Sequence, residues 1–157
     1  MAEILQKIFV GIDVSKKWLD VAMLPSGEVW REENSEAGIR SLLQKLEHVP
    51  GELVRVIVED TGGYEALLVS MLYARHLPVV RVNPRPVRDF AKGLNILAKT
   101  DRIDARVLAR YAKLADPPQR PPPDERTEEL GALTERRRQL VQMRVAERNR
   151  LETQASK

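Results

Sequence analysis

The sequence predicts an α/β fold, in which helices flank a mixed β-sheet and one long C-terminal helix follows. Short apolar runs typical of strands open the chain, and strands and amphipathic helices then alternate. A proline-rich segment separates this part from a final stretch without proline. With 157 residues, 43% of them hydrophobic, the chain is long enough to bury one sizeable core.

The first three strands are expected to form a meander. Lys7 to Val14 is an apolar, β-rich run, and Trp18 to Leu24 alternates well enough for a second strand. A turn at Pro25 to Gly27 leads into a third short strand around Glu28 to Arg31.

Helices and strands then alternate along the chain. The expected order is a helix capped by Ser35, a strand over Leu53 to Val58, a helix over about Tyr64 to Arg75, a strand over Pro78 to Val82, a helix after Pro84, and a helix from near Asp101 to about Ala115. The strand that ends at Glu59 is almost continuously apolar, so we expect it to be central and buried on both faces. Ribonuclease H-like domains use this order of elements.

A stiff proline-rich linker ends the predicted globular part. Five prolines lie between Pro117 and Pro123, whereas the chain from Glu125 to about Gln154 has no proline and one glycine. A helix of roughly 30 residues there would be about 45 Å long. We therefore divide the chain into a domain over 1–115, a linker over 116–124 and a helical arm over 125–157. The arm has too few apolar positions for a strong coiled coil, so we expect it to need a partner.

Composition excludes several classes of protein. A chain without cysteine has neither a disulfide framework nor a thiolate zinc site, which fits the reducing cytoplasm. No stretch approaches the roughly 18 apolar residues that a membrane span requires, so we expect a cytoplasmic protein with no membrane partner.

Basic and acidic residues are unevenly distributed along the chain, whose net charge is +3. Residues 1–74 carry 7 basic and 12 acidic side chains, whereas residues 75–113 carry 10 and 3, and residues 134–157 carry 7 and 3. Basic blocks of this kind are typical of proteins that contact phosphates, although a solvated helix surface produces the same pattern.

Four carboxylates are candidates for a metal site. Asp13 and Glu59 end apolar strands, where an acid is costly unless it is paired or bound to metal. Asp101 and Asp104 are three positions apart, so on a helix they would share a face. Phosphodiester chemistry uses such acids, because Mg²⁺ or Mn²⁺ ions that stabilise the entering and leaving oxygens need oxygen ligands.

Each acid also has a purely structural explanation. Asp13 would pair with the lysines that follow it, and Glu59 would pair with Arg81 or cap the next helix. Asp101 stands where an acid favours a helix N-terminus in any protein. Asp60 competes with Glu59, because side chains alternate along a strand and only one of the two can face the site.

Five strings occur in order along the chain: GIDVSK at Gly11, VEDTGGYE at Val58, VNPRPVRDFAK at Val82, LAKTDRIDARVLARYA at Leu97 and RRRQLVQMRVAERNRLE at Arg136. Together they resemble the DEDD-type transposases of bacterial insertion sequences, a recombinase family guided by a bridge RNA. The resemblance touches most of the chain. It implies a RuvC-like catalytic domain in which Asp13, Glu59, Asp101 and Asp104 bind Mg²⁺.

The resemblance also implies metal-dependent DNA cleavage and exchange, with DNA and a structured guide RNA as partners and homo-oligomerisation through the C-terminal helix. The family's nucleophilic serine belongs to a downstream domain without a place in this sequence, so we expect an N-terminal fragment that is inactive alone. Two residues depart from the family pattern. Asp60 stands where a small residue is expected, and Asn95 stands where glycine is expected, although asparagine also tolerates a left-handed backbone.

Basic side chains near these strings are the candidate nucleic-acid contacts. They are Lys16, Arg85, Arg88, Lys92, Lys99, Arg102 and Arg106, followed by Arg136, Arg137, Arg138, Arg144 and Arg148 in the C-terminal helix. Gly62 and Gly63 would let a phosphate approach a helix N-terminus, or form a plain turn. We expect Trp18, Trp30 and Tyr64 to belong to the core.

Two other functions fit parts of the pattern. One is a non-catalytic RNA- or DNA-binding module in which the acids only support the fold. The other is an actin-like or sugar-kinase-like ATPase, which also opens with an aspartate in a G-I-D context. Such ATPases usually follow the aspartate with glycine and a hydroxyl residue, whereas Val14, Ser15 and Lys16 follow here.

Overall fold

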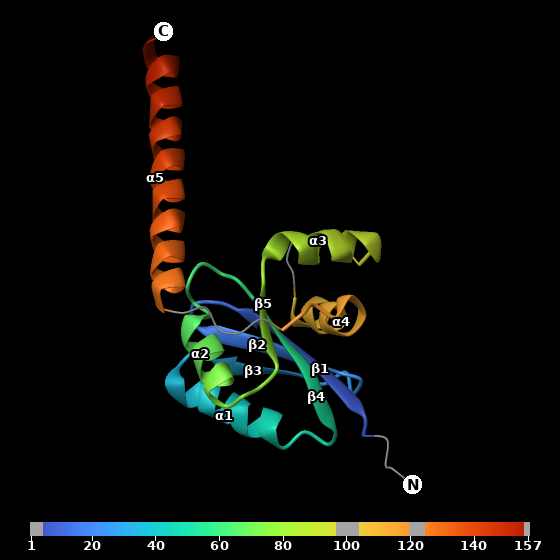
Figure 1. Cartoon of the computed structure of the whole chain (residues 1–157). Coiled ribbons are helices and arrows are strands. Elements are labelled where there is room, and N and C mark those ends of the chain that lie inside the picture. Colours follow the sequence, from blue (N-terminus) through green and yellow to red (C-terminus); the bar gives the residue numbers. More distant parts are fainter. Residues whose placement is uncertain (1–4, 97–103, 120–124, 156–157) are drawn as a thin grey trace. The chain divides into compact units, whose positions relative to one another are not determined.

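The chain folds into two compact units, Met1–Arg120 and Pro121–Lys157. The computed structural model describes residues 5–96, 104–119 and 125–155 of them. The first unit holds the β-sheet and four helices, and the second holds one helix (Figure 1).

Five strands form one mixed sheet. They are β1 (Lys7–Val14), β2 (Trp18–Leu24), β3 (Val29–Glu33), β4 (Glu52–Glu59) and β5 (Val79–Val82). Their order across the sheet is β3-β2-β1-β4-β5. The first three strands are antiparallel neighbours, and β4 and β5 run parallel to β1. The α/β fold expected from the sequence is confirmed, with β3 placed slightly later along the chain than expected.

Two pairs of helices cover the two faces of the sheet. They are α1 (Glu36–Glu47) with α2 (Ala66–Ala74), and α3 (Pro84–Gly93) with α4 (Ala105–Ala115). The alternation along β1 supplies both contacts: Val10 and Ile12 pack with residues of α1 and α2, whereas Phe9 packs with residues of α3 and α4. The central strand β4 contributes to both clusters in the same way, as its apolar run predicts.

Side-chain caps begin two of these helices where the sequence predicts them. The Ser35 hydroxyl accepts a hydrogen bond from the backbone N–H of Gly38 at 3.2 Å. The Asn83 side chain accepts one from the backbone N–H of Arg85 at 2.9 Å, with Pro84 in the first helical position.

Helix α4 lies directly on β1 because Gly11 has no side chain. A Cβ atom on Gly11 would lie 2.3 Å from both the Ala105 carbonyl oxygen and the Ala109 nitrogen. At the other end of α4, the Pro117 carbonyl accepts a hydrogen bond from Arg55, which pairs with Phe9 near the start of β1. Helix α4 therefore runs antiparallel to β1, and its N-terminus lies nearest the carboxyl end of that strand.

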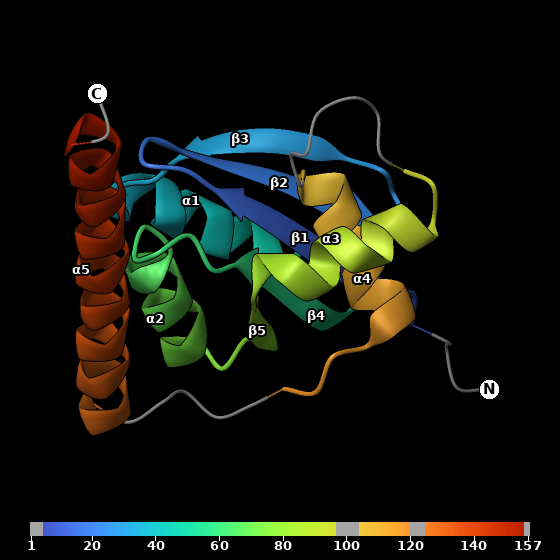
Figure 2. The same ribbon diagram turned by 90° about the horizontal axis from the view of Figure 1, so that it is seen from above.

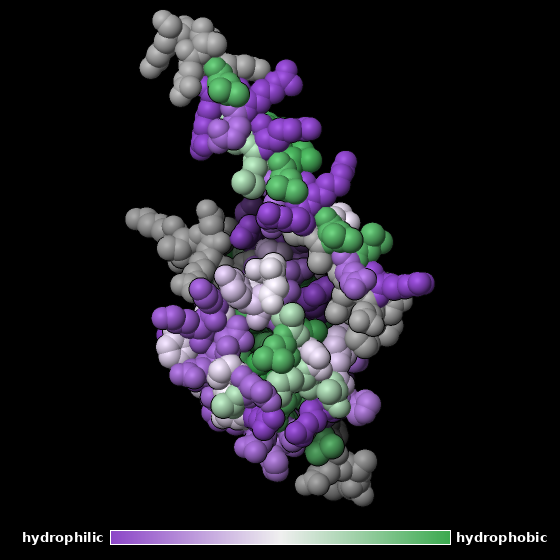
Figure 3. Space-filling model, turned by 90° about the vertical axis from the view of Figure 1, so that its left-hand side faces the viewer, coloured by the Kyte–Doolittle hydropathy of each residue, from purple (hydrophilic) through white to green (hydrophobic). Residues whose placement is uncertain are grey.

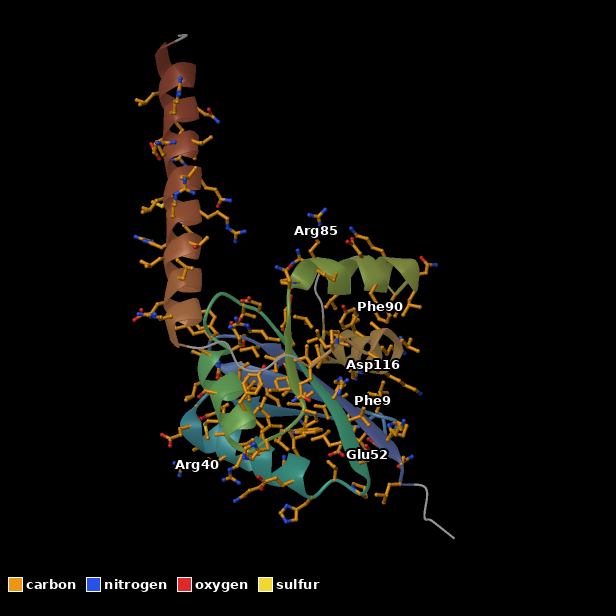
Figure 4. The ribbon with its side chains drawn as sticks, in the orientation of Figure 1. Phe9, Arg40, Glu52, Arg85, Phe90 and Asp116 are labelled. Carbon is orange, nitrogen blue, oxygen red and sulfur yellow. The ribbon has the colours of Figure 1, made fainter. Side chains whose placement is uncertain are left out.

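Helix α3 crosses over α4 on the side away from the sheet (Figure 2). The rings of Phe90 and Tyr111 meet edge to face with centroids 5.2 Å apart. Phe90 points from α3 toward α4, whereas Arg85 points away from the sheet (Figure 4).

The second unit is the helix α5 (Glu125–Ala155), close to the expected bounds. Its described apolar side chains are exposed and stand separately among hydrophilic ones (Figure 3). They are Leu130, Leu133, Leu140, Val141, Met143, Val145 and Leu151. Within residues 5–96, 104–119 and 125–155, no helix combines the length and apolar composition that crossing a membrane would require.

Candidate functional site

Asp13 and Glu59 are neighbours at the carboxyl edge of the sheet. The parallel register pairs Ile12 of β1 with Val58 of β4, so the next residue along each strand is one of these two acids. Glu59 in turn pairs with Val82, which belongs to the apolar cluster under α3 and α4. Paired residues point to the same face of a sheet, so both acids face the α3–α4 side.

Electrostatics around Glu59 favour the binding of a cation. The side chain is only 8% exposed, and this burial raises the pKa of Glu59 above its ordinary value. The negative charge of Asp13 raises that pKa further, Arg88 lowers it, and Asp60 raises it. A cation between the two acids would offset their repulsion, and an all-oxygen set of ligands suits Mg²⁺ or Mn²⁺.

Asp104 caps α4 rather than lying within it. Its backbone is extended, with φ −108° and ψ 167°, and its carboxylate accepts a hydrogen bond from the Val107 N–H at 2.9 Å. The expected position of Asp104 inside a helix is therefore wrong, because α4 begins at Ala105. Asp104 lies at the N-terminus of α4, the end of the helix nearest the carboxyl end of β1.

The rest of the expected tetrad lies outside the described part of the chain. Asp101 belongs to residues 97–103, as do the candidate nucleic-acid contacts Lys99 and Arg102. Within the described ranges, no three His, Asp or Glu side chains are grouped closely enough to hold one metal ion. Of the four acids, the structure thus brings together Asp13 and Glu59.

Asp60 belongs to the turn after β4. Its Oδ1 accepts a hydrogen bond from the Gly62 N–H at 3.2 Å, and its own N–H donates to the Val82 carbonyl. The competition between Asp60 and Glu59 is settled by this turn, because Glu59 is the acid that faces α3 and α4 beside Asp13.

A buried acid that sequence reasoning missed holds the same turn. Glu65 is 2% exposed, and its Oε2 accepts hydrogen bonds from the Thr61 N–H, the Thr61 hydroxyl and the Gly63 N–H at 3.2, 2.8 and 3.0 Å. Burial alone would raise the pKa of Glu65, but the hydrogen bonds lower it overall. Arg81 lies 3.7 Å from Glu65, so the ion pair with Arg81 that was an alternative for Glu59 is made by Glu65.

Asn34 joins the two loops that follow the acids. Its side-chain amide donates to the Ser15 carbonyl at 2.9 Å, just beyond β1, and to the Tyr64 carbonyl at 3.0 Å, just beyond β4. This bridge spans residues far apart in the chain, and no local spacing could have predicted it. It helps to hold the ends of the two acidic strands together.

A family comparison adds to this geometry. The model of the DEDD transposases of IS110-type insertion sequences, described as "Transposase", matches residues 10–156. The chain belongs to this transposase family. The resemblance stated from the sequence is thus confirmed.

Known relatives agree with this assignment. The transposase chain is 30% identical over 153 residues to the pilin gene-inverting proteins of Moraxella lacunata and Moraxella bovis, covering 94% of this chain and 47% of each relative. It is 35% identical over 153 residues to the "Insertion element IS116 uncharacterized 44.8 kDa protein" of Streptomyces clavuligerus, covering 92% of this chain and 37% of that relative. The chain therefore spans less than half the length of these relatives.

The described candidate nucleic-acid contacts of the transposase chain are exposed. Those of the first unit are Lys16, Arg85, Arg88, Lys92 and Arg106, and those of α5 are Arg136, Arg137, Arg138, Arg144 and Arg148. Arg88 is close enough to Glu59 to lower its pKa, which connects the α3 side chains electrostatically with the acidic edge. Gly62 and Gly63 have φ of 78° and 123°, and open space lies where a Cβ atom would stand, so the backbone of this turn is accessible.

Two aromatic predictions are wrong. Trp18 is 40% exposed and Tyr64 is 52% exposed, whereas Trp30 packs against the core as expected. Trp18 begins β2, next to the edge strand β3, and Tyr64 lies in the loop before α2, so among the described residues neither is covered by a second layer of structure. Apolar character alone does not show which layer will cover a side chain.

Proposed function

We propose that this chain is the metal-binding catalytic part of a DNA transposase. In this proposal Asp13, Glu59, Asp101 and Asp104 hold Mg²⁺ or Mn²⁺ for the cleavage and exchange of DNA strands. The observation that carries the proposal is the adjacency of Asp13 and buried Glu59, whose raised pKa reflects a charge that lacks sufficient compensation. A cation would supply that compensation.

The residues of this chain have distinct parts in the proposed chemistry. The Asp13 and Glu59 carboxylates would orient the cation at the sheet edge, and Asp104 would approach from the start of α4. The bound cation would activate an attacking oxygen and stabilise the leaving one. Arg88 would help to neutralise a phosphate there, since its charge already acts on Glu59.

DNA and a structured guide RNA are the partners that we propose. Arg88 of α3 acts on Glu59 at the acidic edge, α3 and α4 carry further exposed basic side chains, and α5 presents a separate set of exposed arginines. Guidance by RNA rests on the family resemblance. Membership of the transposase family argues against the ATPase alternative. A purely structural role would leave Arg88 to offset only part of the cost of burying Glu59 beside Asp13.

We further propose that α5 pairs with a second copy of the chain in the cytoplasm. Its exposed leucines and valines give each helix a small apolar surface, although Arg137 and Arg144 interrupt the row of apolar side chains. Light scattering during size-exclusion chromatography is expected to give a dimer mass that Leu140→Glu converts to a monomer mass. A monomer at every concentration would contradict pairing through α5.

Calorimetric titration with Mn²⁺ tests the metal site. We expect binding to the wild-type chain and at least tenfold weaker binding to Asp13→Asn and to Glu59→Gln. Asp89→Asn is the matched control, because it removes one exposed acid from α3 outside the acidic edge. Equal affinity in all four proteins would remove the metal assignment.

Strand exchange by these 157 residues alone is expected to be weak or absent, because the Moraxella relatives are about twice as long. The assay supplies donor and target DNA with Mg²⁺ and measures recombined product. Robust recombination with DNA alone would contradict this expectation.

A further inference from the structure

A row of charged side chains crosses the sheet from β3 to the acidic edge. The antiparallel registers pair Arg31 with Asp20 and Asp20 with Asp13. Glu59 follows Asp13 in the parallel register. Because directly paired residues share one face, all four side chains lie on the α3–α4 side of the sheet.

The β3 end of this row is open. Helix α4 covers β1 and the part of β2 around Ala22, where Ala105 and Ala109 pack closely. Beyond it, every residue of β3 on this face is exposed, and so is Trp18 at the start of β2. We name the side chains of Trp18, Asp20 and Arg31 the β2–β3 shelf.

Arg31 is held rigidly on this shelf although its side chain is 55% exposed. Its Nε donates to Asp20 Oδ1 at 2.7 Å and its Nη2 donates to Asp20 Oδ2 at 3.2 Å. The guanidinium carbon also lies 5.5 Å from the centroid of the Trp18 ring. Because these hydrogen bonds use Nε and Nη2, Nη1 is the remaining guanidinium nitrogen, and no helix of the described residues covers the exposed Arg31 side chain.

We propose that Arg31 contacts a backbone phosphate of the DNA strand that crosses the β2–β3 shelf on its way to the metal-binding acids. The inference rests on the proposed function, because it concerns the DNA strand whose scissile phosphate would bind at the metal-binding acids. Two inter-strand spacings separate β3 from β1, which corresponds to about 10 Å. Arg31 therefore contacts a neighbouring phosphate rather than the reacting one.

Charge and preorganisation both favour this occupant. Arg31 lies at one end of the row and Arg88 acts on Glu59 at the other, while Asp20, which pairs with Arg31, lies between Arg31 and Asp13. Lys16 and Lys17 add positive charge in the turn between β1 and β2, which offsets Glu33 opposite Trp18. An arginine that is already oriented by a carboxylate and a ring loses little side-chain entropy when it binds a phosphate.

The test compares Arg31→Ala with Arg40→Ala in the full 157-residue chain. Arg40 lies on α1, on the opposite face of the sheet, and pairs with Glu36, so its loss removes the same charge from another surface. Fluorescence anisotropy with a labelled single-stranded DNA oligonucleotide is measured over a series of salt concentrations. We expect Arg31→Ala to bind about tenfold more weakly, with the slope of log affinity against log salt reduced by roughly 0.7.

Control variants separate phosphate contact from a structural role. Arg40→Ala is expected to keep the wild-type salt slope, and Arg31→Lys is expected to recover part of the affinity because it keeps the charge without the two-pronged geometry. Loss of a surface ion pair alone would lower the melting temperature of Arg31→Ala without changing its salt slope. Equal slopes for Arg31→Ala and Arg40→Ala would overturn the inference.

Mn²⁺ titration distinguishes this failure from a failure of the proposed function. Arg31→Ala is expected to bind Mn²⁺ as the wild type does. Absence of Mn²⁺ binding in the wild type would contradict the proposed metal site. Intact Mn²⁺ binding with unchanged DNA affinity in Arg31→Ala would contradict only the proposed phosphate contact of Arg31. An Arg31-dependent preference for an RNA oligonucleotide of the same sequence would overturn the assignment to DNA.

Discussion

Gly11 and Ala105 are in direct contact across the sheet and helix layers. A Cβ atom on Gly11 would lie 2.3 Å from the Ala105 carbonyl oxygen, a separation that the fold does not permit. Because Asp104 immediately precedes Ala105, this contact also decides where the acid at the start of α4 lies. The candidate site thus depends on a glycine that carries no chemistry itself.

Gly11→Ala is expected to destabilise the chain by about 3 kcal/mol or more, since either α4 or β1 must move. The control is Gly93→Ala at the end of α3, where a Cβ atom would meet nothing within 4 Å. That change is expected to be neutral or to stabilise by up to about 1 kcal/mol. Urea unfolding monitored by circular dichroism measures both, and equal stability of the two variants would show that α4 does not press on Gly11.

Substitutions at Asp104 separate helix capping from metal binding. Asp104→Ala is expected to lose about 1 kcal/mol of stability because the Val107 N–H loses its acceptor. Asp104→Asn keeps a capping oxygen but has no carboxylate, so it is expected to stay as stable as the wild type and to bind Mn²⁺ more weakly. Urea unfolding and Mn²⁺ titration on the same samples check the two effects. Wild-type Mn²⁺ affinity in both variants would restrict Asp104 to capping.

Glu59→Gln is expected to stabilise the metal-free chain at pH 7 by roughly 0.5–2 kcal/mol. Burial and Asp13 raise the folded-state pKa of Glu59 above its ordinary 4.5, so its favourable contribution is complete below that value and is lost as pH rises through the folded pKa. The advantage of the glutamine variant should therefore shrink as pH falls toward 4.5. Thermal melts with EDTA between pH 4 and 8 measure it, and an advantage independent of pH would contradict the raised pKa.

Added Mn²⁺ should reverse this order. A ligand that binds only the folded state stabilises it in proportion to occupancy, so the wild type should gain more than Glu59→Gln. The same melts with saturating Mn²⁺ provide the comparison. Equal gains would mean that the ion binds elsewhere.

Glu65→Ala is expected to cost about 2 kcal/mol at pH 7, because the turn at Thr61 and Gly63 loses the acceptor that organises it. The hydrogen bonds lower the folded-state pKa of Glu65, so its stabilisation is complete above the ordinary value of 4.5 and is lost as pH falls through the lower folded value. The difference between variant and wild type should therefore decrease in strong acid. Glu28→Ala, at an exposed acid near β3, serves as the neutral control in urea unfolding. A constant difference down to pH 2 would contradict the lowered pKa.

The sequence alone determined the elements whose cause is local. Alternation and apolar runs placed β1 and β2 with the bounds that the structure has, because side-chain period and burial are written in consecutive residues. Ser35 marked the start of α1 for the same reason. Asn95 adopts the left-handed backbone expected of a glycine substitute, with φ 55°.

Only the tertiary structure decided how distant residues meet. The register of β1 against β4 brought Asp13 beside Glu59, and the contact at Gly11 placed the N-terminal turn of α4 on β1. The pairing of Glu65 with Arg81 on β5, at 3.7 Å, was likewise decided by packing. Such pairings depend on packing between segments that are remote in the chain, and no pattern of neighbouring residues contains that information.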